Sequence, residues 1–238
     1  MFRLYLNSLI FLSCLLIIPN CYALTVEEIF ANFQSAYKKS ENFSATFEET
    51  TLYKDRKTVT YGRFVFSKPN LLRKEYISKN DNKKITKTIV IDGLYAWSHV
   101  PLLNQVNKMQ WNDPSRRELL PGAGASLEDI SKNYTMKLVP DEDVNPKGIY
   151  LIQLLPKRLI PGENENLVVD TSNKEVIEIW LKKSDWLPVQ FGYINEFDDG
   201  SRRSVVFKMT NIERDKNLPT NIFKFEIPKN AEVIDLSN

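Results

Sequence analysis

The chain contains few of the side chains from which metal sites and catalytic centres are commonly built. Its 238 residues include one histidine, two cysteines and eight glycines. Protein metal sites draw mainly on His, Cys and carboxylates, and an activated nucleophile usually needs a base such as His beside it. We therefore expect no catalytic residue, no metal and no cofactor, and a protein that is not an enzyme. Eight glycines and twelve prolines also exclude collagen-like or low-complexity chains.

An excess of charge of one sign is also lacking. Thirty-two basic and thirty acidic residues give a net charge of +2. Electrostatic attraction to nucleic acid needs a strong basic excess, so no nucleic-acid partner is expected. The chain is 42% hydrophobic, 11% aromatic and 26% charged, which is the composition of a globular protein.

The long apolar run of the sequence lies near its N-terminus, at residues 9–18 after Arg3. It is too short for a confident transmembrane span. The small residues at positions −3 and −1 of Cys21-Tyr22-Ala23 predict a signal peptide over residues 1–23 that is cleaved after Ala23. A lipid anchor on Cys21 is the alternative, but an isoleucine, a proline and an asparagine stand where small residues are needed.

Cleavage would leave residues 24–238 as a single domain without cysteine. An exported domain without disulfides is held by its core alone. At this size a core can bury roughly 70% of the unfolded surface, so a single domain is sufficient. The one remaining histidine, His99, leaves almost no material for Ser-His-Asp or Cys-His catalysis.

A helix is predicted over Val26–Lys39. Thr25 and Glu28 have the spacing of a capping box, and two lysines end the segment, where the helix dipole favours cations. Apolar residues recur every three or four positions and form one face. These residues are Val26, Ile29, Phe30, Phe33 and Tyr37.

Apolar and polar residues alternate from Phe43 onward, which is typical of half-buried strands. Asp92-Gly93 predicts a tight hairpin. The short runs and the turn residues between them predict an antiparallel all-β sheet, sandwich or barrel. The runs after this hairpin cover residues 94–99, 106–111, 134–139, 149–155, 176–181, 189–195, 204–212 and 223–227.

Residues 113–132 interrupt the strand series. Asp113-Pro114 has the pattern of an N-cap followed by proline at the first helical position, and Ser126 can cap a second short helix. We expect a short helical insertion here. Its apolar residues are Leu119, Leu120, Leu127 and Ile130.

A curved sheet with helices on its concave side encloses either a packed core or a cavity. A dry apolar cavity suits acyl chains, because each buried methylene contributes about 0.8 kcal/mol. From the alternation alone, the aromatic rings of the strands either fill the core or line such a cavity. The candidate lining residues are Phe43, Phe47, Phe64, Phe66 and Trp97.

The sequence from residue 43 to residue 106 resembles the periplasmic outer-membrane lipoprotein carrier family, LolA. Phe43 and Phe47 match a first strand with two phenylalanines four residues apart, and residues 62–76 match a glycine-led strand, a basic-proline turn and a third strand. The resemblance extends to a C-terminal strand and covers about half of the expected mature chain. Its other matching residues are Asp92, Gly93, Trp97, Pro101, Gln105, Val106, Leu218, Pro219, Phe223, Phe225 and Pro228.

This resemblance implies an unclosed antiparallel β-barrel with an N-terminal helix, in which short lid helices cover a hydrophobic cavity. Members of the family accept triacylated lipoproteins from an inner-membrane ABC transporter. They carry them across the periplasm to an outer-membrane receptor, without covalent chemistry. The expected protein is therefore a periplasmic monomer, with residues 113–132 as its lid.

The resemblance also implies roles for two residues. Lys68 stands at the basic residue before proline, usually an arginine that latches the lid by hydrogen bonds to helix carbonyls. Lysine lacks the planar fork of arginine, and the alternative is a solvated turn residue. Leu72 stands where an apolar residue engages the transporter, and its alternative is an ordinary inward strand leucine. Lys74 and His99 depart from the aromatic residues common at their positions, and we assign them no role.

Two other functions stay open. A carrier or sensor of another lipid or lipid anchor would use the same scaffold. Its two-domain sensor form is not expected, because the sequence ends ten residues after Pro228. An exported hydrolase would need paired acids such as those at 141–143 or 198–199, but both groups stand beside turn formers, where acids are usually solvated.

Overall fold

A single sheet of twelve strands forms the body of the protein in the computed structural model, which describes residues 24–111, 130, 133–157, 175–197, 199–219 and 221–237. The strand order is β12-β6-β5-β4-β3-β2-β1-β11-β10-β9-β8-β7. The strands are β1 (Asn42–Tyr53), β2 (Arg56–Ser67), β3 (Leu71–Ser78), β4 (Asp81–Ile91), β5 (Tyr95–Val100), β6 (Gln105–Gln110), β7 (Tyr134–Val139), β8 (Ile149–Pro156), β9 (Glu175–Lys182), β10 (Pro188–Glu196), β11 (Arg202–Arg214) and β12 (Glu232–Asp235).

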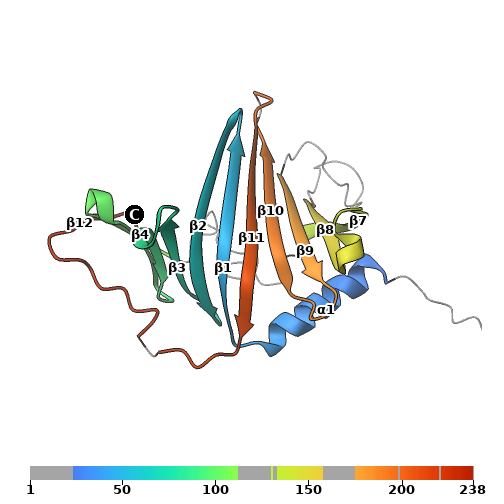
Figure 1. Ribbon diagram of the computed structural model, residues 1–238, viewed down its shortest axis with the longest axis horizontal. Helices are drawn as coiled ribbons and strands as arrows, with labels where there is room; N and C mark the ends of the chain where they lie inside the picture. Colours follow the sequence, from blue (N-terminus) through green and yellow to red (C-terminus); the bar gives the residue numbers. More distant parts are fainter. Residues whose placement is uncertain are drawn as a thin grey trace, which may run out of the picture.

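The sheet is antiparallel except at β12, which pairs in parallel with β6. Because β7 and β12 are its two edges and do not pair with each other, the sheet is unclosed (Figure 1). The predicted unclosed, mainly antiparallel architecture with one N-terminal helix is confirmed. Each run predicted between residues 94 and 212 contains a strand. The predicted lid, 113–132, lies outside the described residues except for Ile130.

The helix α1 (Val26–Lys39) has the predicted bounds and the predicted capping box. Thr25 Oγ1 accepts the backbone N–H of Glu28, whose carboxylate accepts the backbone N–H of Thr25. Ile29, Phe30 and Phe33 are buried in the core, as the apolar face predicts. Figure 1 shows α1 running across one end of the sheet. No helix within the described ranges has the length and apolarity needed to cross a membrane.

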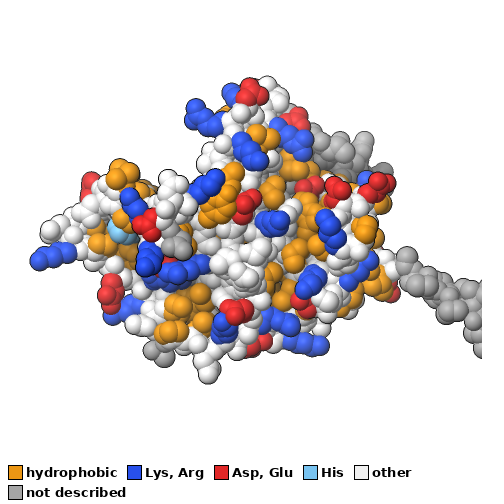
Figure 2. Space-filling view, in the orientation of Figure 1, with side chains coloured by type: hydrophobic (Ala, Val, Ile, Leu, Met, Phe, Trp, Pro, Cys, Tyr) orange, Lys and Arg blue, Asp and Glu red, His pale blue; other side chains and the backbone are white. Residues whose placement is uncertain are grey.

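Two short 3₁₀ helices, η1 (Pro101–Leu103) and η3 (Asn145–Lys147), connect strands at the periphery. Basic and acidic side chains are interspersed over the face seen in Figure 2, in keeping with the small net charge of the sequence. The described surface in that view therefore shows no broad patch of one sign.

Strand register decides which side chains share a face, because successive residues point to opposite sides. We call the face that carries the core the inner face. It holds Phe47 of β1, Phe64 of β2 and Leu72 of β3, all buried. Gly62 lies beside Phe47, and a Cβ there would come within 2.5 Å of the Phe47 ring. Glycine at this position therefore lets the Phe47 ring cross β2 and meet the Tyr76 ring of β3 edge to face, with ring centroids 5.4 Å apart.

The prediction of a strand at residues 223–227 is wrong. None of the described strands pairs with this segment, which lies against the outer face, where Phe225 stacks on Trp97 with ring centroids 5.3 Å apart. Its alternating aromatic residues pack against a face of the sheet and do not extend an edge. The chain instead ends in β12, whose four residues are too few to give a clear alternation.

Candidate ligand cavity

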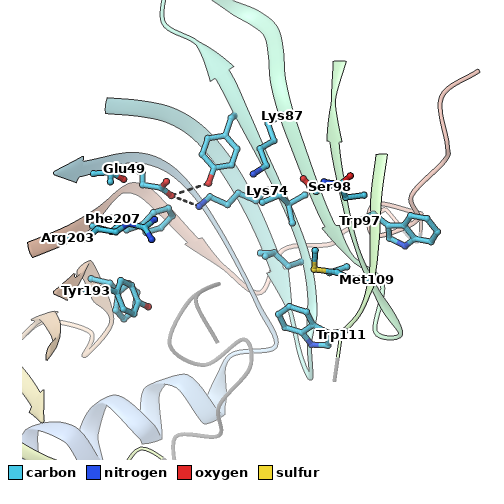
Figure 3. A pocket seen from close by; sticks show the side chains of 18 of the residues that line it. Glu49, Lys74, Lys87, Trp97, Ser98, Met109, Trp111, Tyr193, Arg203 and Phe207 are labelled. Carbon is cyan, nitrogen blue, oxygen red and sulfur yellow. Dashed lines mark hydrogen bonds and ion pairs between the residues drawn. The ribbon is translucent and has the colours of Figure 1, made fainter. Parts of the chain in front are cut away.

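A cavity of about 560 Å³ lies on the inner face, with β3 to β6 on one side and β10 and β11 on the other. Its volume is within the range of about 300–1,000 Å³ that is common for ligand pockets. Figure 3 shows its side chains converging from these two groups of strands. The curvature of one sheet therefore forms the cavity, and residues far apart in the sequence form its opposite walls.

The part of the cavity nearest to α1 is apolar. Leu72, Ala96 and Met109 lie side by side there on β3, β5 and β6, as the register places them on one rung through Ile91. Leu72 is 1% exposed. Trp111 and Phe191 add aromatic surface to the same cavity. This region has the character that an acyl chain requires.

A buried lysine occupies the next rung. Lys74 Nζ donates to Glu49 Oε2 at 2.7 Å, and the Tyr76 hydroxyl donates to the same oxygen at 3.2 Å. The Lys74 ammonium also lies 4.6 Å from the ring centres of Phe47 and Phe207 and 4.8 Å from that of Tyr76. Three aromatic faces and one carboxylate thus surround this cation.

Burial sets the protonation behaviour of this cluster. It lowers the pKa of Lys74 below the ordinary 10.5, although attraction to Glu49 partly offsets the shift and repulsion from Lys87 adds to it. Burial, reinforced by the negative charge of Glu49, raises the pKa of the Tyr76 hydroxyl far above its ordinary 10.0. Tyr76 is therefore a neutral hydrogen-bond donor throughout the physiological pH range.

The predicted phenylalanine candidates pack the core and do not line this cavity. Phe43 and Phe66 stack on each other and on Tyr37 of α1, with ring centroids 5.5 to 6.4 Å apart. Phe64 is buried beside Phe207. Phe47 is also buried, and only its contact with the Lys74 ammonium links it to the cavity. The alternative that these rings fill the core is the arrangement observed.

Trp97 is the remaining aromatic candidate for the cavity lining. It borders the cavity, yet its indole ring projects to the outer face, because inner-face positions of β5 are Ala96 and Ser98. There the indole N–H donates to Asp92 Oδ2 at 2.8 Å, and the ring stacks on Phe225. Trp97 therefore anchors the C-terminal segment, and its ring is not available to a ligand in the cavity.

The lid candidates are only partly described. Ile130 is 3% exposed and belongs to the core cluster. Leu119, Leu120 and Leu127 lie outside the described residues.

The two residues assigned roles by resemblance lie in different settings. Lys68 Nζ donates to the backbone carbonyl of Lys38 at 2.8 Å, in the last turn of α1, and lies 5.1 Å from the centre of the Tyr37 ring. Lys68 thus binds a helix carbonyl, as the resemblance implies for the latch residue. This carbonyl belongs to the N-terminal helix and not to the predicted lid. Leu72 forms part of the cavity wall, and its burial leaves almost no surface for another protein in this conformation.

The charged residues of the cavity were missed by sequence reasoning. They are Glu49, Lys74, Lys87 and Arg203. A signal was available for Lys74, because strand alternation places it on the same face as Leu72 and Tyr76. The partners of Lys74 were not predictable, since Glu49 and Phe207 come from strands that meet it only in the folded sheet. Within the described part of the chain, no group of three His, Cys, Asp or Glu side chains is placed to hold a metal ion.

A single unclosed sheet thus curves around a ligand-sized cavity, an architecture suited to binding a ligand. No family model matches the chain. An outer-membrane lipoprotein carrier protein from Methylibium petroleiphilum is 31% identical over 195 residues, which cover 80% of this chain and 81% of that protein. The chain belongs to the LolA family of outer-membrane lipoprotein carrier proteins.

Solved structures with a similar course of the chain include three bacterial proteins. An uncharacterized conserved protein from Thermus thermophilus has a TM-score of 0.49 and 16% identity, covering 88% of this chain and 98% of that one. A LolA superfamily protein from Nitrosomonas europaea has a TM-score of 0.41 and 12% identity, covering 85% and 99%. A putative outer membrane lipoprotein-sorting protein domain from Vibrio parahaemolyticus has the same score and identity, covering 84% and 97%. With TM-scores below 0.5, these likenesses add nothing to the assignment.

Proposed function

We propose that this protein is a periplasmic chaperone that binds the acyl chains of lipoproteins released from the inner membrane and delivers them to the outer membrane. The observation that carries this proposal is the apolar part of the cavity, formed around Leu72, Ala96 and Met109. Membership of the lipoprotein carrier family supports lipoprotein as the cargo. Binding and release need only a difference in affinity between successive acceptors, so the function requires no catalytic group.

The proposed partners are those of a shuttle. Triacylated lipoproteins are the cargo, an inner-membrane lipoprotein-releasing ABC transporter is the donor, and an outer-membrane lipoprotein receptor is the acceptor. The carrier acts as a monomer after removal of residues 1–23. Lys68 serves as a latch, because its bond to the Lys38 carbonyl ties the turn after β2 to α1.

A second candidate function is transport of another lipid on the same scaffold. The observation that favours it is the Lys74–Glu49 ion pair inside the cavity, since a site for hydrocarbon alone gains nothing from buried charges. Both candidates predict an acyl chain in the cavity, and they differ in what the chain is attached to.

Native mass spectrometry of the protein purified from periplasm without detergent tests the proposal. A bound mass that resolves into a triacylated lipoprotein is the expected result, and a free lipid would move the function to the second candidate. Ala96→Phe, which fills the apolar end of the cavity, should reduce the bound fraction. Gln110→Leu is the control, because it adds a similar apolar side chain at an exposed position of β6. Equal loading of all three proteins would contradict binding in this cavity.

A further inference from the structure

The cavity changes from apolar to cationic along one direction of the sheet. On the β3–β6 wall, the rung of Leu72, Ala96 and Met109 is followed by a rung that contains Lys74 and Ser98. The next residues on this face are Tyr76 and Lys87, which pair across β3 and β4. Successive residues on one face are about 7 Å apart along a strand, so this change in polarity takes place within roughly 14 Å.

The opposite wall changes in the same direction. Phe191 and Phe207 pair across β10 and β11, Tyr193 pairs with Val205 on the next rung, and Asn195 pairs with Arg203 on the one after. All six residues border the cavity.

Strand β1 fixes the common direction, because it reaches both walls through its two neighbours. At one end of β1, Phe43 pairs with Phe66 of β2, which in turn pairs with Leu72 of β3. At the other end of β1, Tyr53 pairs with Arg203 of β11. The two walls are therefore apolar at the same end and polar at the same end. Since Tyr37 of α1 stacks on Phe43, the apolar end lies at α1 and the cationic end lies away from it.

Among the described residues, the cationic end of the cavity carries more positive than negative charge. Glu49 is the one carboxylate among the described residues that line the cavity, and it pairs with Lys74. Within the described ranges, no carboxylate lies within 4.0 Å of the Lys87 ammonium or the Arg203 guanidinium. Lys87 is directed toward the Lys74–Glu49 pair, and its repulsion reaches Lys74 (Figure 3). An anion placed between these groups would relieve that repulsion.

We propose that the cavity binds an amphiphile in one orientation, with its acyl chain against Leu72 and Met109 and an anionic head group, a carboxylate or a phosphate, at Lys87 and Arg203. This inference rests on the proposed role of the cavity in acyl-chain binding and deepens the second candidate function, because the acylated end of a triacylated lipoprotein carries neither a carboxylate nor a phosphate. Apolar burial supplies most of the affinity, and charge-assisted hydrogen bonds select the head group and set the direction of entry.

Four probes with the same 16-carbon chain separate these contributions: palmitate, lysophosphatidate with a palmitoyl chain, methyl palmitate and hexadecylamine. Binding is measured by displacement of a fluorescent fatty-acyl dye below the micelle concentration of each probe. We expect both anions to bind at least about tenfold more tightly than the ester, and the amine to bind most weakly. The tighter of the two anions identifies carboxylate or phosphate as the preferred group.

Variants locate the selectivity. Lys87→Gln and Arg203→Gln should each weaken binding of the anions several-fold and leave binding of the ester unchanged. Lys208→Gln and Arg202→Gln are matched controls, because they remove the same charges from exposed positions of β11. Equal affinity for anions and ester in the wild-type protein would overturn the head-group inference while leaving the acyl cavity in place. Failure of all four probes to displace the dye, or of the dye to bind, would overturn the proposed function as well.

Discussion

At the scale of single residues, the most informative feature is Lys74. A buried ion pair gains from mutual attraction but loses the hydration of both charges, so it adds little stability over an apolar pair of similar volume. Removal of one partner is costly because the other charge stays buried. Glu49 depends on Lys74 and Tyr76 for its hydrogen bonds, and its side chain is only 21% exposed.

We predict that Lys74→Met destabilises the protein by about 3 kcal/mol, the lower end of the range for a broken buried pair, because Glu49 keeps some contact with water. The double variant Lys74→Met with Glu49→Leu should regain at least half of this loss. Urea unfolding followed by tryptophan fluorescence measures both. Lys208→Met, at an exposed position, serves as the control and should change stability by less than about 0.5 kcal/mol. Additive losses in the double variant would show that the two charges do not depend on each other.

At the scale of elements, the hairpin between β4 and β5 shows that a sequence motif can act as one physical unit. The Asp92 carboxylate accepts the backbone N–H groups of Leu94 and Tyr95 and the indole N–H of Trp97. Burial would raise the pKa of Asp92, but these hydrogen bonds outweigh it and hold the pKa below its ordinary 3.8. Gly93 has a φ of +100°, which a side chain would strain. The aspartate of the turn thus holds both the turn itself and the tryptophan of the following strand.

The contact between α1 and the turn after β2 is the second element-scale feature. Lys68 connects the two through one hydrogen bond and one cation–ring contact. A lysine makes fewer directed bonds than an arginine would at this position, so the connection is one that can be broken at modest cost. This is the property expected of a latch that opens during each transfer.

We predict that Lys68→Leu lowers the stability by only about 1 kcal/mol, the contribution of one partly exposed hydrogen bond, yet changes the handling of cargo. The variant should still accept lipoprotein but pass it poorly to the receptor. Transfer of labelled lipoprotein from the loaded carrier to receptor-containing membranes measures the effect. Lys68→Arg should keep transfer at the wild-type rate, and Lys57→Leu, at an exposed position of β2, should have no effect. Transfer by Lys68→Leu at the wild-type rate would contradict the latch.

At the scale of the whole molecule, the C-terminal segment ties distant parts of the sheet together. After β11 the chain crosses the outer face to reach the other edge, where β12 pairs with β6 (Figure 1). Phe225 stacks on Trp97, and the guanidinium of Arg73 donates to the carbonyl of Ile222 at 3.5 Å. The segment thereby supports the outer side of the strands whose inner side forms one wall of the cavity.

We predict that Phe225→Ala destabilises the protein by about 1–2 kcal/mol, because it removes a stacked aromatic pair and the surface that the ring buries. Limited proteolysis should then cut residues 221–227 faster than in the wild-type protein. Ile227→Ala is the matched control, since Ile227 is 51% exposed and its truncation removes little buried surface. Equal proteolysis of the two variants would show that the Trp97 stack does not hold the segment.

The sequence by itself determined α1, most of the strands and their antiparallel pairing, and its resemblance to the LolA family implied the unclosed sheet. These features follow from local patterns: a capping box, a helical or strand period, and a motif order. Only the tertiary structure decided which aromatic rings pack the core, that the ring of Trp97 faces outward, and that the last segment crosses a face before pairing at an edge. It also brought Glu49, Lys74, Lys87 and Arg203 to one cavity from four different strands. The physical reason is that strand alternation assigns a residue to one of two faces, whereas curvature and strand order decide what lies opposite it.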